Sequence, residues 1–514
     1  MNTLIPKLVP FAWKAFYALF AIAFVPGIIF IFFRSRTGLS PILLPFITVV
    51  LVLPLLIGAW HMAGRIALTL SEKTQKQLLI AFLVLSGIVQ LIIGNRLRFV
   101  PMWDVEAIFD GGRYWALTGH LEHHTVFHVT YLRYFAMKSV QWGSLFLFRC
   151  LFWVYNLFGG TDFYRPALVW NVAMVQVTAF AMYSAAKRLK GLRAGLFVLF
   201  LLVIFLPFHF FGAVFYTDTL SMPFVAIAFA LYLRAKDEQE LKRKMMFFAA
   251  CGLAVAVGAA IKTTVLIVLV AILIDLLLTS EKKGWRTRLL GAGAAALAFV
   301  IFFGGFYMYM SRIVIGPELT ERYRLPRTHW FMMGLQGYGH YCPRDFDFTM
   351  NIHDLATRQS ETSRVARERI RNLGFGGMAH MYAGKFAINF GDGTYELHRI
   401  LHLNPVNYSR MHYMVLSHGR HFNAYMHIAT GITTALLLLM LKGALFAFFK
   451  PGNPENTAVP CLSFFGLVLL LTVWESGGRL TMNFFPMLVI GAIIGLSVID
   501  GLSRYAFFAN NAEQ

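Results

Sequence analysis

Charged side chains are scarce in this sequence, and acidic ones are the scarcest. Of its 514 residues only 14% are Asp, Glu, Lys or Arg, and only 25 are acidic, whereas about a quarter of a soluble domain is charged. A water-soluble fold is therefore excluded. The hydrophobic share of 58% and the mean hydropathy of +0.62 predict an all-α polytopic membrane protein.

Cysteine is also rare. The four cysteines, Cys150, Cys251, Cys342 and Cys461, have neither CxxC nor metal-type spacing, so they imply no disulfide framework and no zinc site. A nucleic-acid partner is not expected either, although the net charge is +21. The basic residues stand in short clusters between apolar runs, which is the pattern of cytoplasmic loops in a membrane protein.

Long apolar runs are abundant. The first, which ends at about Phe33, lacks a small-residue cleavage pattern, so we expect a retained helix and no signal peptide. A helix needs about 20 mostly apolar residues to cross a bilayer. By this criterion the sequence predicts about 12 spans, near residues 12–33, 42–60, 78–94, 166–185, 194–213, 221–234, 245–261, 263–279, 289–310, 426–449, 459–474 and 483–500.

Four basic clusters between these runs set the predicted orientation, because Lys and Arg concentrate on the cytoplasmic side. The clusters are Lys73 with Lys76, the turn from Lys187 to Arg193, the stretch from Arg234 to Lys244, and the stretch from Lys282 to Arg288. All four clusters fall on the same side of the membrane if the apolar segment 142–158, which contains Arg149, lies at the outer membrane surface and does not cross the bilayer. Arg34 and Arg36 then lie in a short outer loop, contrary to the preference of basic residues for the cytoplasmic side.

This topology divides the chain into four parts. Residues 1–77 form an N-terminal two-helix membrane segment, and 78–310 form the transmembrane core with an acidic outer loop at 95–165. Residues 311–425 form a long extracytoplasmic loop or small domain, and 426–514 supply the C-terminal transmembrane helices. In the long loop we predict a polar helix from Thr349 to Leu373 that ends at Gly374, followed by a helix from Met378 to Phe390.

The acidic outer loop holds the first candidate residues for chemistry. Asp104, Glu106 and Asp110 follow aromatic and apolar neighbours that favour partial burial, and carboxylates serve as general bases beside sugars and phosphates. In a helix Asp104 lies on one face, whereas Glu106 and Asp110 share another. We therefore take Asp104 as the candidate base and Glu106 as a candidate substrate contact; the alternative is three solvated loop carboxylates.

Three further short outer segments carry charge. Asp218 stands in a short connection between spans, where it either caps the next helix or points into a cavity. Lys262 breaks a long apolar stretch, and it is either a snorkelling turn lysine or a cation for a lipid phosphate. Glu475 and Arg479 flank two glycines at membrane depth. An ion pair between them would lock the hairpin, and it is compatible with substrate binding by the same residues.

Histidines and aromatics supply weaker candidates. A divalent metal is possible at the group His120, Glu122, His123, His124 and His128, but its spacing is not that of a HExxH site and the metal stays unknown. The stretches 329–334 and 389–394 combine aromatic and polar side chains that would suit a sugar. Ordinary loop packing explains these two stretches equally well.

Several of these features, in order along the chain, resemble the GT-C glycosyltransferases, and in particular their protein mannosyltransferase and aminoarabinose transferase-like (family 39-like) branch. The resemblance covers about residues 95–500. It is carried by Asp104 after a membrane helix, Leu157-Phe158-Gly159, Arg165, the basic turn from Lys187 to Arg193, Tyr216-Thr217-Asp218, Gly252-Leu253 through Ile261-Lys262, and Glu475 through Arg479 followed by Phe485-Pro486. The acidic loop departs from the family in reading Asp-Val-Glu instead of an adjacent acidic pair, and two helices precede the usual first one.

The resemblance implies a GT-C-type helical bundle with interfacial helices, a polyprenyl-phosphate-linked sugar donor and inversion at the anomeric carbon. Asp104 would be the general base, Lys262 a contact to the donor phosphate, and Glu475 with Arg479 part of the donor pocket. The acceptor would be a glycan, a wall polymer, a lipid or a protein. We expect a multi-pass protein of a plasma membrane, a bacterial one being the better assignment, with an extracytoplasmic active site; the alternative is a multi-span transporter or a lipid-linked glycan flippase or ligase.

Overall fold

The computed structural model describes residues 5–33, 43–121, 125–278, 284–402, 404–449 and 458–512. Within these ranges nearly every regular element is a helix, and the one sheet is a two-stranded hairpin of β1 (Thr125–Val126) and β2 (Val129–Thr130). The predicted all-α fold is therefore confirmed. Arg34, Arg36, Glu122, His123 and His124 lie outside the described residues.

Eight helical stretches in the described ranges are long and apolar enough to cross a membrane. They are formed by α1 (Ile5–Phe33), α2 (Leu43–Thr69), α3 (Glu72–Arg96), α9 (Thr217–Asp237), α10 (Leu241–Ile261), α12 (Trp285–Tyr309), α19 (Phe422–Phe449) and α21 (Phe485–Ala512). The last of these stretches begins in the 3₁₀ helix η7 (Gly478–Phe484), which precedes α21. The pair α7 (Tyr164–Ile204) and α8 (Leu206–Phe210), which meet at a bend of 73°, passes the same test of length and composition when taken together. The predicted number of about twelve is not confirmed by this criterion.

The long helix α7 turns back on itself at its basic segment. Lys190 and Gly191 leave helical geometry, with φ +74° at Gly191, a value that glycine adopts without a steric cost. A Cβ atom on Gly195 would lie 3.3 Å from the Cβ of Lys187, although eight residues of straight helix span about 12 Å. The turn from Lys187 to Arg193 thus joins two antiparallel helices, as the sequence predicts for two spans here.

Two further apolar helices are shorter. They are α11 (Leu266–Leu277), which continues from the 3₁₀ turn η3 (Thr263–Val265), and α20 (Ala458–Val473). They occupy the segments predicted as spans near 263–279 and 459–474. Glycines bring neighbouring helices close together: a Cβ atom on Gly252 of α10 would overlap the carbonyl oxygen of Ala295 on α12.

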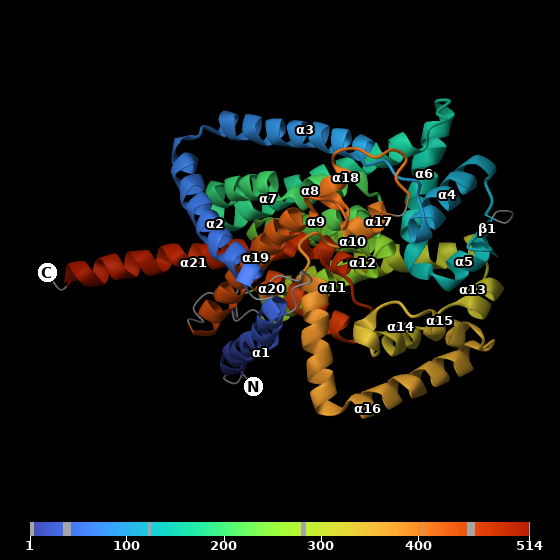
Figure 1. Ribbon diagram of the computed structural model, residues 1–514. Helices are drawn as coiled ribbons and strands as arrows, with labels where there is room; N and C mark the ends of the chain where they lie inside the picture. The colour runs from blue at the N-terminus through green and yellow to red at the C-terminus, as the bar shows by residue number, and fades with distance from the viewer. Residues whose placement is uncertain are drawn as a thin grey trace.

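The remaining elements are α4 (Trp103–Thr118), α5 (Tyr131–Met137), η1 (Ser139–Gln141), α6 (Trp142–Leu157), η2 (Phe211–Ala213), the π-helical turn η4 (Met310–Val314), α13 (Pro317–Tyr323), α14 (Arg327–Gly334), η5 (Gly337–Gly339), α15 (Pro343–Met350), α16 (Leu355–Phe390), α17 (Leu397–Leu401) and α18 (His412–Val415). Most of them lie toward the right of Figure 1 or along its lower side, whereas α17 and α18 lie in its upper middle. The segment expected at the membrane surface forms α6, which is not among the candidate spans. Arg149 in α6 stacks over Trp115 of α4, with 5.4 Å between guanidinium carbon and ring.

The polar helix expected from Thr349 to Leu373 starts later than predicted. Thr349 belongs to α15, and α16 begins at Leu355 because the Asp354 side chain accepts a hydrogen bond of 2.6 Å from the backbone N–H of Thr357, which caps the helix. The expected break at Gly374 is present, with φ +57°. Beyond it α16 continues to Phe390 and packs on α1, where the Tyr382 hydroxyl donates to the Ala23 carbonyl at 2.6 Å.

Candidate functional site

Asp104 in the first turn of α4 is the centre of a hydrogen-bond network. Its Oδ1 accepts from the Tyr134 hydroxyl at 2.6 Å and from the Lys138 Nζ at 2.5 Å. Its Oδ2 accepts from Gln141 Nε2 and from the Tyr216 hydroxyl, both at 3.2 Å. The Asp104 side chain is still one quarter exposed, so a ligand can reach the carboxylate.

This network sets the charge on Asp104. Burial alone would raise its pKa, but the Lys138 ammonium, the Tyr134 hydroxyl and the Arg479 guanidinium outweigh burial and hold the pKa of Asp104 below its usual value. Burial and the Asp104 charge raise the pKa of Tyr134. Asp104 is therefore an anion at neutral pH, and Tyr134 stays protonated as its donor.

A second charged cluster contains Asp218, Lys262 and Arg479. Lys262 Nζ donates to Asp218 Oδ1, and Arg479 Nη1 lies 3.9 Å from Asp218 Oδ2. The side chains of Asp218 and Lys262 are only 5% and 11% exposed, whereas that of Arg479 is 32% exposed. Lys262 is thus a buried, paired lysine and not a snorkelling one, and Arg479 is the more accessible cation.

Tyr216 joins the two clusters. Its hydroxyl donates to Asp104 and accepts from Gln141 Nε2 at 3.0 Å, and the Arg479 guanidinium carbon lies 5.2 Å from the centre of its ring, a cation–π distance. Tyr216, Asp218 and Arg479 also line a hollow whose empty volume is about 260 Å³, part of it open to solvent. Four segments distant in sequence, at 104, 216–218, 262 and 479, therefore meet at one place.

The local fold of α9 explains why Asp218 is free to take part. The Thr219 hydroxyl accepts from the backbone N–H of Tyr216 at 3.3 Å and donates to the Val214 carbonyl at 2.9 Å. Thr219 thus provides a partner for the backbone N–H of Tyr216 at the start of α9, and the Asp218 carboxylate makes no capping hydrogen bond to a described residue. The Asp218 carboxylate instead faces Lys262 at the end of α10.

Glu475 lies near these groups without a bond to them. This half-buried carboxylate has no hydrogen bond or ion pair to any other described residue, and burial raises its pKa. The ion pair that we considered between Glu475 and Arg479 is absent, because the carboxylate within 4 Å of Arg479 belongs to Asp218. Among the described residues, Glu475 is thus left able to accept a hydrogen bond from a ligand.

Lys385 and Asn389 of α16 hold the loop that carries Glu475. Lys385 is buried and donates to the carbonyls of Gly334, Thr472 and Trp474 at 2.8, 3.0 and 2.6 Å, which uses all three ammonium protons. The Asn389 side-chain oxygen accepts from the backbone N–H of Gly477 at 2.8 Å. Both anchors fix the backbone on either side of Glu475.

Glu106 and Asp110 lie apart from this network. Asp110 pairs with Arg113 one turn later, at 2.9 Å. Burial and the neighbouring Asp110 charge raise the pKa of Glu106, and no hydrogen bond or ion pair joins its carboxylate to another described residue. The predicted division of α4 into two acidic faces therefore holds, and the structure does not bring Glu106 to Asp104.

Of the histidine group the structure describes only His120 and His128, whereas both aromatic stretches are described in full. His120 and His128 are exposed, and among the described residues no group of three or more His, Cys, Asp or Glu could hold a metal ion. His329 is buried and bonded to the Thr349 hydroxyl at 2.7 Å, while Asn389 is buried in the core. Packing explains the placement of both.

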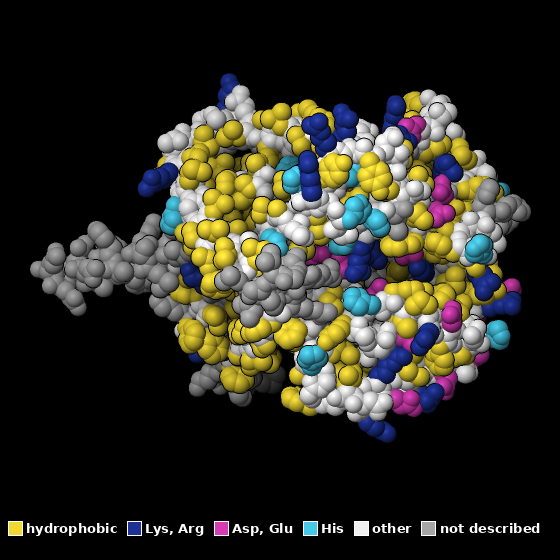
Figure 2. Space-filling view, in the orientation of Figure 1, with side chains coloured by type: hydrophobic (Ala, Val, Ile, Leu, Met, Phe, Trp, Pro, Cys, Tyr) yellow, Lys and Arg dark blue, Asp and Glu magenta, His cyan; other side chains and the backbone are white. Residues whose placement is uncertain are grey.

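Sequence reasoning missed three of the four partners of Asp104: Tyr134, Lys138 and Gln141. They lie on α5, on η1 and at the residue between them, about 30 residues after the carboxylate, and no spacing rule connects the two stretches. The one available signal was a lysine in a predominantly apolar and aromatic segment from Tyr131 to Trp142. Figure 2 shows a hollow in which basic and acidic side chains gather between apolar surfaces.

Helices long enough to cross a membrane, with a charged network at one end of the bundle, define an integral membrane protein with a polar site. The chain belongs to the family described as "conserved hypothetical integral membrane protein", whose model matches residues 11–498. No curated protein sequence matches it.

Two solved structures are similar at 12% identity. One is the archaeal oligosaccharyltransferase AglB from Archaeoglobus fulgidus in complex with an inhibitory peptide and a dolichol-phosphate, with a TM-score of 0.43 over 85% of this chain and 52% of that chain. The other is ArnT from Cupriavidus metallidurans bound to undecaprenyl phosphate, with a TM-score of 0.37 over 83% of this chain and 77% of that chain. The chain thus spans about half the length of AglB.

Proposed function

We propose that the protein is an integral-membrane glycosyltransferase that moves a sugar from a polyprenyl-phosphate donor to an acceptor hydroxyl, with inversion at the anomeric carbon. The observation that carries the proposal is the link through Tyr216, which joins an ionised carboxylate, Asp104, to a cluster that holds Lys262 and Arg479. An acceptor hydroxyl and an anionic leaving group need these two kinds of side chain at neighbouring positions.

Asp104 acts as the general base in this reaction. It removes the proton of the acceptor hydroxyl while the acceptor oxygen forms a bond to the anomeric carbon. The bond between that carbon and the phosphate oxygen breaks, and the phosphate leaves with the electron pair. The hydroxyl reaches Asp104 by displacing the 3.2 Å hydrogen bond from Gln141, while the hydrogen bond from Tyr216 is kept.

Lys262 and Arg479 stabilise the departing lipid phosphate. A phosphate leaving group needs little help from a general acid, so positive charge suffices. Arg479, whose side chain is about one third exposed, would bind the phosphate through its guanidinium group. Lys262 is more deeply buried and adds a second positive charge. Asp218 holds both cations in place.

Glu475 would accept hydrogen bonds from hydroxyl groups of the donor sugar, since its carboxylate has no partner among the described residues. Glu106, on the other face of α4, stays a predicted substrate contact. The acceptor is a glycan, wall polymer, lipid or protein, and the site faces outward from a bacterial plasma membrane.

The test begins with a deletion strain. Mass spectrometry of lipid-linked glycans and wall polymers should identify the missing sugar, and purified protein in liposomes should then transfer that sugar from its polyprenyl phosphate. Asp104→Asn should abolish transfer, whereas Asp110→Asn, on the other face of the same helix, should keep most of it. Full transfer by Asp104→Asn would refute the base assignment, and movement of intact lipid-linked glycan without transfer would favour a flippase.

A further inference from the structure

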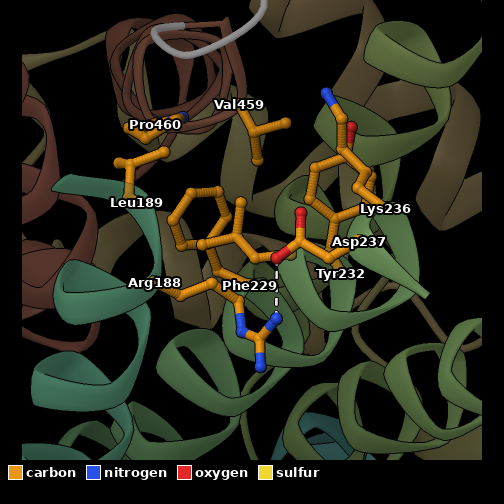
Figure 3. A pocket seen from close by; sticks show the side chains of 9 residues that line it. Arg188, Leu189, Phe229, Tyr232, Lys236, Asp237, Val459 and Pro460 are labelled. Atoms are coloured by element: carbon orange, nitrogen blue, oxygen red, sulfur yellow. Dashed lines mark hydrogen bonds and ion pairs between the residues drawn. The ribbon is translucent and has the colours of Figure 1, made fainter. Parts of the chain in front are cut away.

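A second polar hollow lies at the end of the bundle opposite Asp104. It forms where the turn of α7, the last turn of α9 and the first turn of α20 meet, and has an empty volume of about 500 Å³, part of it open to solvent. Figure 3 shows Arg188, Lys236 and Asp237 around it, with Phe229 and Val459 on its apolar walls. The reaction proposed above uses none of these residues.

The position of the hollow follows from α9. Asp218 of the candidate site lies in the first turn of α9 and Asp237 is its last residue, so the two are about 28 Å apart along the axis. The hydrocarbon core of a bilayer is about 30 Å thick. With the Asp218 site at one membrane surface, as in the proposed function, this length places the hollow at the opposite surface, at the depth of lipid headgroups.

The cations of the hollow are held in place by carboxylates. Asp275 of α11, 1% exposed, accepts from the Tyr232 hydroxyl and lies 3.6 Å from Lys236 Nζ. Arg188 donates through Nη1 to Asp237 at 2.6 Å, and among the described residues its other guanidinium donors have no partner. These contacts fix two positive charges at the edge of the hollow.

The surroundings carry an excess of positive charge. The turn of α7 and the stretch from Arg234 to Lys244 hold nine basic residues and, with Asp275, only four acidic ones. Apolar walls below two fixed cations suit an amphipathic anion, whose charged group stays at the surface while its hydrocarbon part contacts the walls. A soluble anion would gain nothing from the walls.

We propose that this hollow binds the phosphate headgroup of an anionic phospholipid. The competing explanation is that the basic residues only orient the chain in the membrane. That explanation predicts no preference between headgroups at the hollow, and it predicts equal effects for basic residues inside and outside it.

The experiment uses the full chain in neutral detergent, where no charged bilayer attracts the protein as a whole. Short-chain phosphatidylglycerol and phosphatidylcholine are titrated separately, and bound lipid is counted by native mass spectrometry. We expect one phosphatidylglycerol to bind. Its affinity should fall about thirtyfold in Arg188→Gln/Lys236→Gln, since two cations near the phosphate are lost.

Two variants make the result specific. Lys242→Gln/Lys244→Gln removes the same charge from the same end of the bundle but leaves the hollow intact, and should bind as the wild type does. Leu233→Trp fills the hollow without a change of charge, and should weaken binding even if the double glutamine variant fails to fold. Equal loss of affinity in the two charge variants, binding of phosphatidylcholine as tight as that of phosphatidylglycerol, or full displacement by an equal concentration of inorganic phosphate would overturn the proposal.

Discussion

The Tyr216 hydroxyl donates a hydrogen bond of 3.2 Å to Asp104, and the same residue presents its ring to Arg479 at 5.2 Å. One side chain thus contacts both the proposed base and the proposed phosphate-binding cation. A change in the position of Tyr216 would alter both halves of the site at once.

Tyr216→Phe should lower transfer by about tenfold or more, because a hydrogen bond to an ionised group is lost. The ring and its contact with Arg479 stay, so the KM for the donor should change little. The measurement is kcat and KM in liposomes. Tyr131→Phe, a buried tyrosine without a bond to Asp104, serves as the control, and an equal loss in both variants would contradict a role for the Tyr216 hydroxyl.

Lys138→Met should move the acid limb of the pH profile to higher pH. A general base must be ionised, so transfer falls as the pH drops through the pKa of Asp104. Lys138 is the largest of the influences that lower this pKa, and its removal lets burial raise it. Transfer rates across the acidic range measure the shift. Lys138→Arg keeps the positive charge, so its pH–rate profile should match that of the wild type. An unchanged acid limb in Lys138→Met as well would show that Lys138 does not set the pKa of Asp104.

Lys262→Met should destabilise the fold, since it leaves Asp218 charged and buried without its main partner, at a cost of about 3–5 kcal/mol. Adding Asp218→Asn should recover most of the lost thermal stability because the buried charge is gone. Transfer should not recover, because the phosphate still lacks its cation. Recovery of full transfer in the double variant would show that the pair is only structural.

Lys385 predicts a specific pH dependence of stability. Burial lowers the pKa of Lys385 to about 7, whereas the pKa of an exposed lysine is about 10.4. Between these values the unfolded chain binds the proton that the folded chain has lost, so stability attributable to Lys385 rises with pH across this window and is constant below it.

Thermal unfolding of wild type and Lys385→Met from neutral to alkaline pH measures this contribution. The difference in Tm between the two proteins should change in favour of the wild type as the pH rises. Parallel Tm curves would mean that Lys385 keeps its proton throughout.

Much of the fold could be predicted from the sequence, because long apolar runs indicate membrane-spanning helices and basic clusters indicate their orientation. Each predicted span overlaps a helix of the described residues, and the turn at Gly191 falls inside the predicted basic loop. The start of α16 was wrong because the Asp354 cap, a local hydrogen bond, decides it against a continuous polar pattern.

The site was predictable only in part. Asp104, Asp218, Lys262 and Arg479 stood out because charge is rare near membrane segments, and the structure brings them together. Lys138 and Gln141 did not stand out, since only tertiary packing brings η1 against α4. The ion pair between Glu475 and Arg479, one of the alternatives for this loop, does not form, because the carboxylate next to Arg479 is that of Asp218.

The buried anchors of α16 have a consequence for how this protein can be cut. Lys385 and Asn389 bond to backbone at residues 472–477, and Tyr382 bonds to α1, so α16 is held to both the first helix of the chain and the segment between its last two helices. Residues 311–425 expressed alone would lose the hydrogen bonds from Lys385 and Asn389 to residues 472–477. We therefore expect that this segment does not fold independently. A truncation that removes α1, or α20 and α21, should release α16 from the bundle.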